Sequence, residues 1–291
     1  MEGLRAYWEL IKPRQTFAIL CLFLLSVIAS SPGKLVYLIG FGAIPLGVAS
    51  VFISVAGSNA LNCYLDRDID LVMARTRRRP IPSGRVGESV AFMFSSLLIF
   101  LSLFLAFFLG QAAVLFLVVG LLSYIFAYTI LSKRRNVLNV FANAPAIASP
   151  VWFGWIVGRG SLDFHGIFVG ALVALWGPLH LWSLAIVFSK DYERAQIPML
   201  PSTVGPRKAR WHILVLSIML ASASYLLYFL GYNGLLYLGG ITVLNLALVA
   251  LSLRIFIDPI GKRCWRVYKF SAPYMVGLLL VVALDQLLII H

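Results

Sequence analysis

Long apolar stretches alternate along the chain with short charged ones. About nine of these stretches have roughly the length that a helix needs to cross a membrane. They lack the period-two alternation of a membrane β-barrel, so helices remain the structure that satisfies the backbone in lipid. The pattern predicts an all-α, polytopic membrane bundle that forms one domain over residues 1–291. The predicted spans lie near residues 16–31, 37–61, 89–110, 111–131, 137–157, 165–188, 211–231, 235–256 and 270–290.

The composition supports a membrane protein. Hydrophobic residues make up 61% of the chain and charged residues only 12%, which is too apolar for a soluble domain of this length. The first stretch ends in small residues, as a signal peptide does, but its removal would leave too few helices for the expected bundle. Cys21, Cys63 and Cys264 form neither a disulfide pattern nor a metal-binding pattern.

Basic residues give the chain a net charge of +13, and their positions explain this charge. If the N-terminus is cytoplasmic, the predicted spans place every Lys and Arg except Lys34 and Arg159 on the cytoplasmic side. This distribution follows the positive-inside rule. We therefore expect a multi-pass protein of the cell membrane whose N-terminus and loops near 66–88 and 190–210 are cytoplasmic. The same distribution explains the basicity without a nucleic-acid partner.

The most unusual charges follow the second apolar stretch. Asn62, Asp66 and Asp70 are spaced i, i+4 and i+8, which stacks their side chains on one helical face. Two carboxylates one turn apart repel each other unless a cation lies between them. Mg²⁺ binds one or two carboxylates together with substrate phosphates, so the spacing predicts a magnesium site for a phosphorylated substrate. The alternative is a solvated loop in which Arg67 and Arg75 neutralise the aspartates.

A second acidic stretch, with Asp191 and Glu193, follows the sixth apolar stretch. Four spans separate it from the first, so we expect both at the same membrane face, where Asp191 would complete the carboxylate set. A solvated loop is again the alternative. Asp285 falls within the last predicted span, but its closeness to the C-terminus predicts a position at the outer interface rather than an intramembrane site.

The string NCYLDRDIDLVMARTRRRPIPSG, from Asn62 to Gly84, resembles the first aspartate-rich motif of the UbiA superfamily of membrane prenyltransferases. It is most similar to the branch of that superfamily that farnesylates protohaem IX. The resemblance extends over most of the chain to about Pro201 and implies a helical bundle around a central cavity. Further matches to this branch are Tyr128-Thr129, Lys133-Arg134-Arg135, Asn139, Pro150, Gly154-Trp155 and the stretch from Asp191 to Pro201.

The resemblance also implies roles for individual residues. Asp66, Asp70 and Asp191 would carry catalysis by binding Mg²⁺, which bridges them to the diphosphate of a prenyl donor. The donor would be farnesyl diphosphate and the acceptor a membrane-soluble haem, haem B, with membrane lipid around both. Basic side chains would neutralise the leaving diphosphate. The candidate substrate-binding residues are Asn62, Arg75, Arg79, Tyr128, Lys133, His180 and Lys190.

The sequence departs from this branch in the fifth predicted span. Asn143 and Ile147 stand where small residues are expected, and the usual Pro-Pro pair keeps only Pro150. Ala195 replaces the last aspartate of the superfamily's second motif, although the haem branch has the same pattern. These departures concern the shape of the acceptor pocket more than the reaction class. A UbiA-type enzyme with an aromatic or lipid-alcohol acceptor therefore remains an alternative.

Other interpretations stay open for three side chains and for the class of protein. His180 either contacts haem iron or packs between helices through a hydrogen bond. Tyr124 and Tyr128 either line a cavity or belong to the aromatic belt at the membrane interface. A transporter would place ionisable residues and broken helices near the bilayer midplane, whereas the acids here lie at helix ends on one face. Transport is therefore disfavoured.

Overall fold

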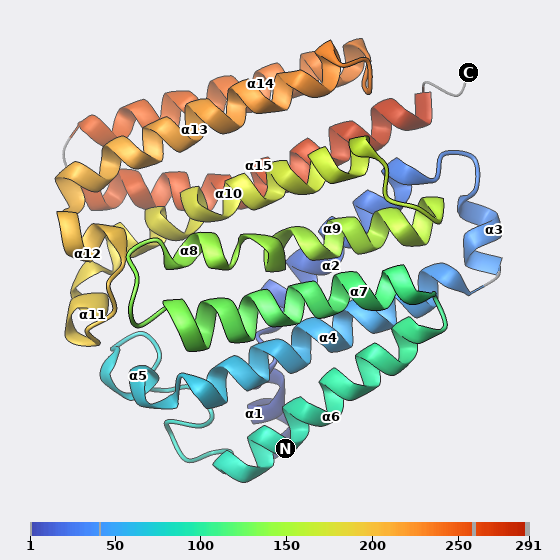
Figure 1. The fold of residues 1–291 in the computed structure, drawn as a ribbon. Helices are drawn as coiled ribbons and strands as arrows, with labels where there is room; N and C mark the ends of the chain where they lie inside the picture. The colour runs from blue at the N-terminus through green and yellow to red at the C-terminus, as the bar shows by residue number, and fades with distance from the viewer. Residues whose placement is uncertain (1, 41, 258–259, 289–291) are drawn as a thin grey trace.

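The computed structural model describes residues 2–40, 42–257 and 260–288, and in these ranges nine helical segments are long and apolar enough to span a membrane (Figure 1). The prediction of an all-α membrane bundle is confirmed. The last span begins well before residue 270, because charged residues in its first turns interrupt the apolar pattern. The spans are α2 (Pro13–Ser30), α4 (Ala43–Leu65), α6 (Glu88–Phe107), α7 (Gln111–Leu121) continued by the π-helix η1 (Leu122–Ser132), α8 (Asn139–Ala142) continued by α9 (Ala144–Arg159), α10 (Phe164–Val187), α13 (Pro206–Phe229), α14 (Leu235–Leu253) continued by η2 (Arg254–Phe256), and α15 (Ile260–Leu288).

Apart from α1 (Glu2–Leu10), the short helices lie at the two ends of the bundle. We call one end the motif end, because both acidic stretches lie there, at the left of Figure 1. Helix α3 lies at the opposite end. The structure thus places the two acidic stretches at one end of the bundle, as the even number of crossings predicts. The short helices are α1 (Glu2–Leu10), α3 (Leu35–Gly40), α5 (Arg67–Val72), α11 (Ser189–Arg194) and α12 (Leu200–Val204).

Six of the spans form an inner ring. Around this ring α2 packs on α4, α4 on η1, η1 on α9, α9 on α10, α10 on α15, and α15 back on α2. Helices α6, α13 and α14 pack on the outside. Only 22% of the apolar window of α6 is buried, against 56% for α9 and for α10, so α6 presents most of its surface to lipid.

Small residues bring α2 and α9 into close contact. Gly154 and Gly158 are four residues apart on one face of α9, the spacing of small residues at membrane helix interfaces. A Cβ atom at Gly154 would lie 2.7 Å from the Phe23 carbonyl oxygen, and one at Gly158 would lie 2.9 Å from that of Val27. Any larger residue would push these helices apart. The inner ring therefore depends on these two glycines.

Asp285 is 2% exposed and lies near the C-terminal end of α15. Its place at the outer interface stays a prediction. Its carboxylate accepts hydrogen bonds from the backbone N–H of Gly234 at 2.7 Å, the N–H of Tyr237 at 3.0 Å and the side-chain amide of Asn233 at 3.0 Å. A carboxylate from α15 therefore caps the N-terminus of α14, which explains why a buried acid is stable there.

Candidate active site

A cavity of about 530 Å³ lies inside the inner ring and reaches the motif end. Leu22 of α2, Val51 of α4 and Leu117 of α7 are apolar parts of its wall, and Ser54, Ser58 and Asn59 of α4 add polar groups. Charged side chains gather where the cavity meets the motif end. The structure therefore confirms the expected central cavity and shows that α6, α13 and α14 contribute no lining residue from the described ranges. The charged lining residues are Lys12, Arg14, Asp66, Asp70, Arg75, Arg79 and Lys133.

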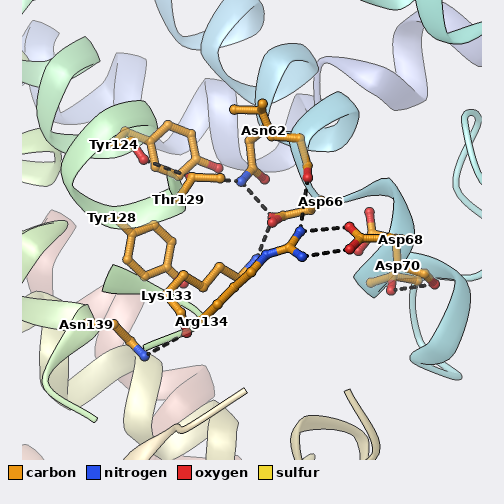
Figure 2. Close-up of polar contacts among 12 residues, drawn as sticks. Asn62, Asp66, Asp68, Asp70, Tyr124, Tyr128, Thr129, Lys133, Arg134 and Asn139 are labelled. Carbon is orange, nitrogen blue, oxygen red and sulfur yellow. Dashed lines mark hydrogen bonds and ion pairs between the residues drawn. The ribbon is translucent and has the colours of Figure 1, made fainter. Parts of the chain in front are cut away.

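Asp66 lies at a bend between two helices. Helix α4 ends at Leu65, Asp66 has φ −95° and ψ 7°, and α5 begins at the next residue. The i to i+4 backbone hydrogen bonds nevertheless continue through this bend, from the Asp66 N–H to the Asn62 carbonyl at 2.9 Å and from the Asp70 N–H to the Asp66 carbonyl at 2.8 Å. All three side chains line the cavity, as their spacing predicts. The Oδ2 atom of Asp66 accepts hydrogen bonds from Asn62 Nδ2 at 2.8 Å and from Lys133 Nζ (Figure 2). Its Oδ1 atom is buried and has no hydrogen-bond partner among the described residues.

Asn62 connects Asp66 to two further groups. Its Oδ1 accepts a hydrogen bond from Lys12 Nζ at 2.8 Å, and its Nδ2 also lies 3.2 Å from Thr129 Oγ1. Lys12 has φ +51°, a left-handed conformation that is rare outside glycine and is often associated with functional sites. Burial lowers the pKa of the Lys12 ammonium, although Asp66 and Asp70 act to raise it. A second lysine is therefore held at the carboxylate cluster.

The π-helix η1 positions Lys133. Its wide turns carry backbone i to i+5 hydrogen bonds, such as that from the Lys133 N–H to the Tyr128 carbonyl at 2.8 Å. The Thr129 hydroxyl also donates to the Tyr124 carbonyl at 2.8 Å. These turns direct Lys133 Nζ at Asp66 and place it 5.9 Å from the centre of the Tyr128 ring. Both Tyr124 and Tyr128 line the cavity, so the aromatic-belt interpretation does not describe their position.

The carboxylate of Asp70 points toward Arg79 and not toward Asp66. The Nη1 atom of Arg79 lies 2.9 Å from Oδ1 and 2.7 Å from Oδ2 of Asp70, whose side chain is almost completely buried. Burial alone would lower the pKa of the Arg79 guanidinium, but its attraction to Asp70 raises that pKa above the ordinary value. Asp70 is thus already neutralised by a protein cation, whereas Asp66 keeps one free oxygen.

Arg75 joins the two acidic stretches at the mouth of the cavity. Its Nη2 lies 3.5 Å from the Tyr192 hydroxyl oxygen of α11, and its guanidinium carbon lies 5.1 Å from the centre of the Phe188 ring. Arg75 and Tyr192 both line the cavity. This contact brings the second stretch to the edge of the site.

The other two predicted residues of the second stretch are less well placed. Asp191 is buried, but it is not among the residues that line the cavity, and its carboxylate has no hydrogen bond or ion pair with the described residues. Lys190 is exposed and likewise does not line the cavity. The roles of Asp191 as a metal ligand and Lys190 as a substrate-binding residue therefore stay predictions.

Asp68 shows what a carboxylate outside the cavity does. Its two oxygens accept hydrogen bonds from Arg134 Nη1 at 2.6 Å and Nη2 at 2.7 Å, and its side chain is 61% exposed (Figure 2). The bond from Arg134 lowers the pKa of the Asp68 carboxyl group. This ion pair is exposed, but its cation is Arg134 and not Arg67 or Arg75, which the solvated-loop interpretation names. Asp66 and Asp70 are buried, so that interpretation does not describe them.

The cavity wall formed by α9, α10 and α15 differs from the rest. It carries Trp176, His180 and Tyr268, with ring centres 4.6 Å apart for Trp176 and His180 and 4.5 Å apart for His180 and Tyr268. Ile147 lies over Gly177, so that a Cβ atom at position 177 would lie 2.6 Å from Ile147 Cδ1. The bulky residue on α9 is accommodated because α10 has a glycine opposite it.

The carboxylate cluster fits an Mg²⁺ ion that is bound partly by the protein and partly by the substrate. No group of three or more His, Cys, Asp or Glu side chains that could hold a metal ion occurs within residues 2–40, 42–257 and 260–288. Mg²⁺ does not need such a cage, because it is commonly bound by one or two carboxylates together with substrate phosphates. The free, buried Oδ1 of Asp66 is a suitable ligand. The surrounding lysines and arginines outnumber the carboxylates, which suits a polyanionic ligand.

Residues 19–273 match the model of the UbiA prenyltransferase family. The chain belongs to this family. The curated protoheme IX farnesyltransferase of Symbiobacterium thermophilum is 36% identical to it over 291 residues, which is 98% of this chain and 95% of the relative.

Two solved structures have the same fold. A structure of digeranylgeranylglyceryl phosphate synthase has a TM-score of 0.79 at 22% identity and covers 99% of both chains. A UbiA homologue from Archaeoglobus fulgidus, solved with DMAPP and Mg²⁺, has a TM-score of 0.69 at 17% identity and covers 95% of this chain and 98% of its own. At these identities the likeness concerns the fold of the UbiA family alone.

Several side chains of this UbiA site were not predicted from the sequence. Lys12 and Thr129 both contact Asn62, and Ser271 contacts His180, yet none of them was predicted. Lys12 precedes Pro13, which occupies the first turn of α2, so a basic residue directly before a proline at the start of a span was a usable signal. Thr129 belongs to a matched pair, Tyr128-Thr129, but was given no role, and Ser271 gave no signal, because hydroxyl residues are common in membrane helices.

Proposed function

We propose that this UbiA family member transfers the farnesyl group of farnesyl diphosphate to protohaem IX in an Mg²⁺-dependent reaction. The product is haem O, which carries a hydroxyethylfarnesyl side chain. The resemblance to a full-length protoheme IX farnesyltransferase supports the donor and the acceptor. The observation that carries the proposal is the buried Asp66, with its free Oδ1 and its neighbouring lysines, at the polar end of a large apolar cavity.

The polar end of the cavity would hold the diphosphate. Lys12, just before α2, and Lys133, just after η1, approach the same Asn62–Asp66 pair, and Arg79 also lines the cavity. Ammonium and guanidinium groups donate charge-assisted hydrogen bonds to phosphate oxygens, which stabilises the leaving diphosphate. Mg²⁺, held by Asp66, would add its charge to the same leaving group. Asp70 would orient Arg79, and Asp191 and Lys190 would approach from the second stretch.

The apolar wall would hold the farnesyl chain away from water. Once the bond between C1 and the diphosphate oxygen breaks, the allylic carbon is positively charged and reacts with any nucleophile that reaches it. Leu22, Val51 and Leu117 offer no nucleophile. The rings of Tyr124 and Tyr128, stacked with centres 6.2 Å apart, present π-electron faces that stabilise a cation.

The acceptor would lie against the wall that carries Trp176 and His180. The farnesyl C1 forms a bond with the terminal carbon of a haem vinyl group, and the adjacent vinyl carbon becomes positive. A water molecule adds to that carbon and releases one proton, which leaves with the diphosphate or to solvent. Trp176 would contact the planar macrocycle with the edge of its ring, and Ile147 would limit how far the macrocycle enters.

The orientation is part of the proposal. We place the N-terminus and the motif end in the cytoplasm, since the basic loops of the chain lie at that end. Cysteines introduced near residues 78 and 194 should then react with a membrane-impermeant reagent only from the cytoplasmic side. Labelling of the two sites from opposite sides would contradict a single site formed by both stretches.

An aromatic or lipid-alcohol acceptor is the second candidate, because Ile147 fills space beside Gly177 in the acceptor wall. The test is a competition experiment. Purified protein in lipid nanodiscs receives farnesyl diphosphate and Mg²⁺ with haem B, a hydroxybenzoate or a lipid alcohol, and the products are identified by mass spectrometry. Haem O as the main product supports the proposal, and EDTA should stop its formation. Prenylation of another acceptor without haem O would overturn it.

A further inference from the structure

Ser271 forms a hydrogen-bond junction beneath the acceptor wall. This residue of α15 is completely buried. Its backbone carbonyl accepts a hydrogen bond from Trp176 Nε1 at 2.7 Å, and its Oγ lies 2.7 Å from His180 Nδ1. The same hydroxyl donates to the backbone carbonyl of Tyr268 at 2.8 Å. One serine thus fixes two of the side chains that face the acceptor.

These contacts select one tautomer of His180. The serine hydroxyl has a single proton, and the Tyr268 carbonyl can only accept. If Ser271 donates to that carbonyl, its oxygen is left to accept, so His180 Nδ1 must carry the proton. The opposite assignment would bring two oxygen acceptors to 2.8 Å with no proton between them. Only the Nδ1–H tautomer satisfies both contacts.

The Nε2 atom is then left with an unshared electron pair. Trp176 stacks on the imidazole at an interplanar angle of 29° and Tyr268 lies against it at 33°, so the ring cannot turn without losing both contacts. His180 lines the cavity, and its Nε2 has no hydrogen-bond partner within the described ranges. A clamped, neutral imidazole with a free Nε2 is the form in which histidine binds a metal.

We propose that Ser271 is a positioning residue that holds His180 in the Nδ1–H tautomer and directs Nε2 at the iron of the haem acceptor. The inference rests on the proposed function for the identity of the acceptor. A metal-binding histidine usually donates its second N–H to a fixed acceptor, which sets its orientation and strengthens the iron bond. Here that acceptor is the Ser271 hydroxyl oxygen. Binding through iron would hold the macrocycle in one orientation relative to the farnesyl donor.

The first test needs no haem. Solid-state NMR of the protein labelled at its histidines distinguishes the two tautomers from the ring chemical shifts, with His180→Ala to assign the signal. We expect the Nδ1–H tautomer in the wild-type protein and its loss or mixing in Ser271→Ala. Ser271→Thr, which keeps the hydroxyl, should restore it. Ser252→Ala is the matched control, since Ser252 is equally buried and hydrogen-bonded to Ser217 at 2.7 Å, away from the cavity.

The second test measures the iron bond. Ferrous haem B bound to the protein should give an iron–histidine stretching band in resonance Raman spectra, and His180→Ala should remove it. Ser271→Ala should lower its frequency and weaken haem binding about tenfold, while the affinity for farnesyl diphosphate stays within about twofold.

The outcomes distinguish a failure of the proposed function from a failure of this inference alone. If the wild-type protein binds no haem, the proposed function fails and this inference fails with it. If haem binds but the band persists in His180→Ala, or if Ser271→Ala changes neither tautomer nor band, the inference alone is overturned.

Discussion

The substitution Asp66→Asn tests the site sharply, because it removes one charge and keeps the size of the side chain. Asp66 is 1% exposed, and its Oδ2 accepts hydrogen bonds from Asn62 and Lys133. A carboxamide oxygen can still accept these bonds, so the fold should survive. The amide nitrogen would then occupy the position of the free Oδ1, and an NH₂ group cannot bind a cation.

The expected loss follows from the charge removed. Two unit charges about 4 Å apart interact by about 4 kcal/mol at an effective dielectric constant of about 20. If that interaction is lost from the transition state, kcat/KM falls by about 10³-fold. The assay is the initial rate of haem O formation in nanodiscs as a function of Mg²⁺ concentration. The concentration that gives half the maximal rate should also rise.

Asp68→Asn is the control, because Asp68 lies two residues away but forms an exposed ion pair with Arg134. Exposed pairs contribute about 0–1 kcal/mol, so this variant should keep its activity within about threefold. The reasoning is refuted if Asp66→Asn keeps more than about a tenth of the wild-type rate with unchanged Mg²⁺ dependence, a loss of less than about 1.4 kcal/mol. An equal loss in both variants would refute it as well.

Three further predictions concern other parts of the molecule. Burial lowers the pKa of Lys12, and only the protonated form of Lys12 binds diphosphate, so the affinity for farnesyl diphosphate, measured by calorimetry, should fall as the pH rises through that pKa. Lys12→Arg should flatten this pH dependence, and the same pH dependence in both proteins would contradict a role of Lys12 in binding the diphosphate. Gly177→Ala should push Ile147 into the cavity and raise the KM for haem about tenfold, equivalent to about 1.4 kcal/mol. Adding Ile147→Ala should restore the wild-type KM, and a KM that stays high in the double variant would contradict the contact between residues 147 and 177. Asp285→Ala should destabilise the protein by about 3 kcal/mol, because α14 loses its cap. The thermal unfolding midpoint should fall while kcat/KM at low temperature stays unchanged, and an unchanged midpoint would contradict the capping role.

The sequence predicted the spans well because the apolar stretches are long and the charges between them are clustered. It predicted less well where local breaks interrupt an apolar run. The second span was predicted from residue 37, but α3 ends at Gly40 and α4 begins only at Ala43, after Gly42 with φ +73°. The spacing of small residues and glycines does not reveal such a break, since glycine is also common inside membrane helices.

The site was predicted in part for a related reason. Regular spacing placed Asn62, Asp66 and Asp70 on one face, but spacing says nothing of the long-range partners that decide where each carboxylate points. Lys133 is 67 residues from Asp66 in sequence, and the turn after α5 brings Arg79 to Asp70. Lys12 was not predicted as a site residue, because its contact with Asn62 depends on how α2 and α4 pack.

A structure of the protein with a non-hydrolysable farnesyl diphosphate analogue and Mg²⁺ tests the central claim most directly. We expect the metal on Asp66 Oδ1 and the diphosphate within hydrogen-bonding distance of Lys12 and Lys133, with the farnesyl chain along Leu22 and Val51. A diphosphate bound away from this cluster, or a metal held without Asp66, would contradict the account.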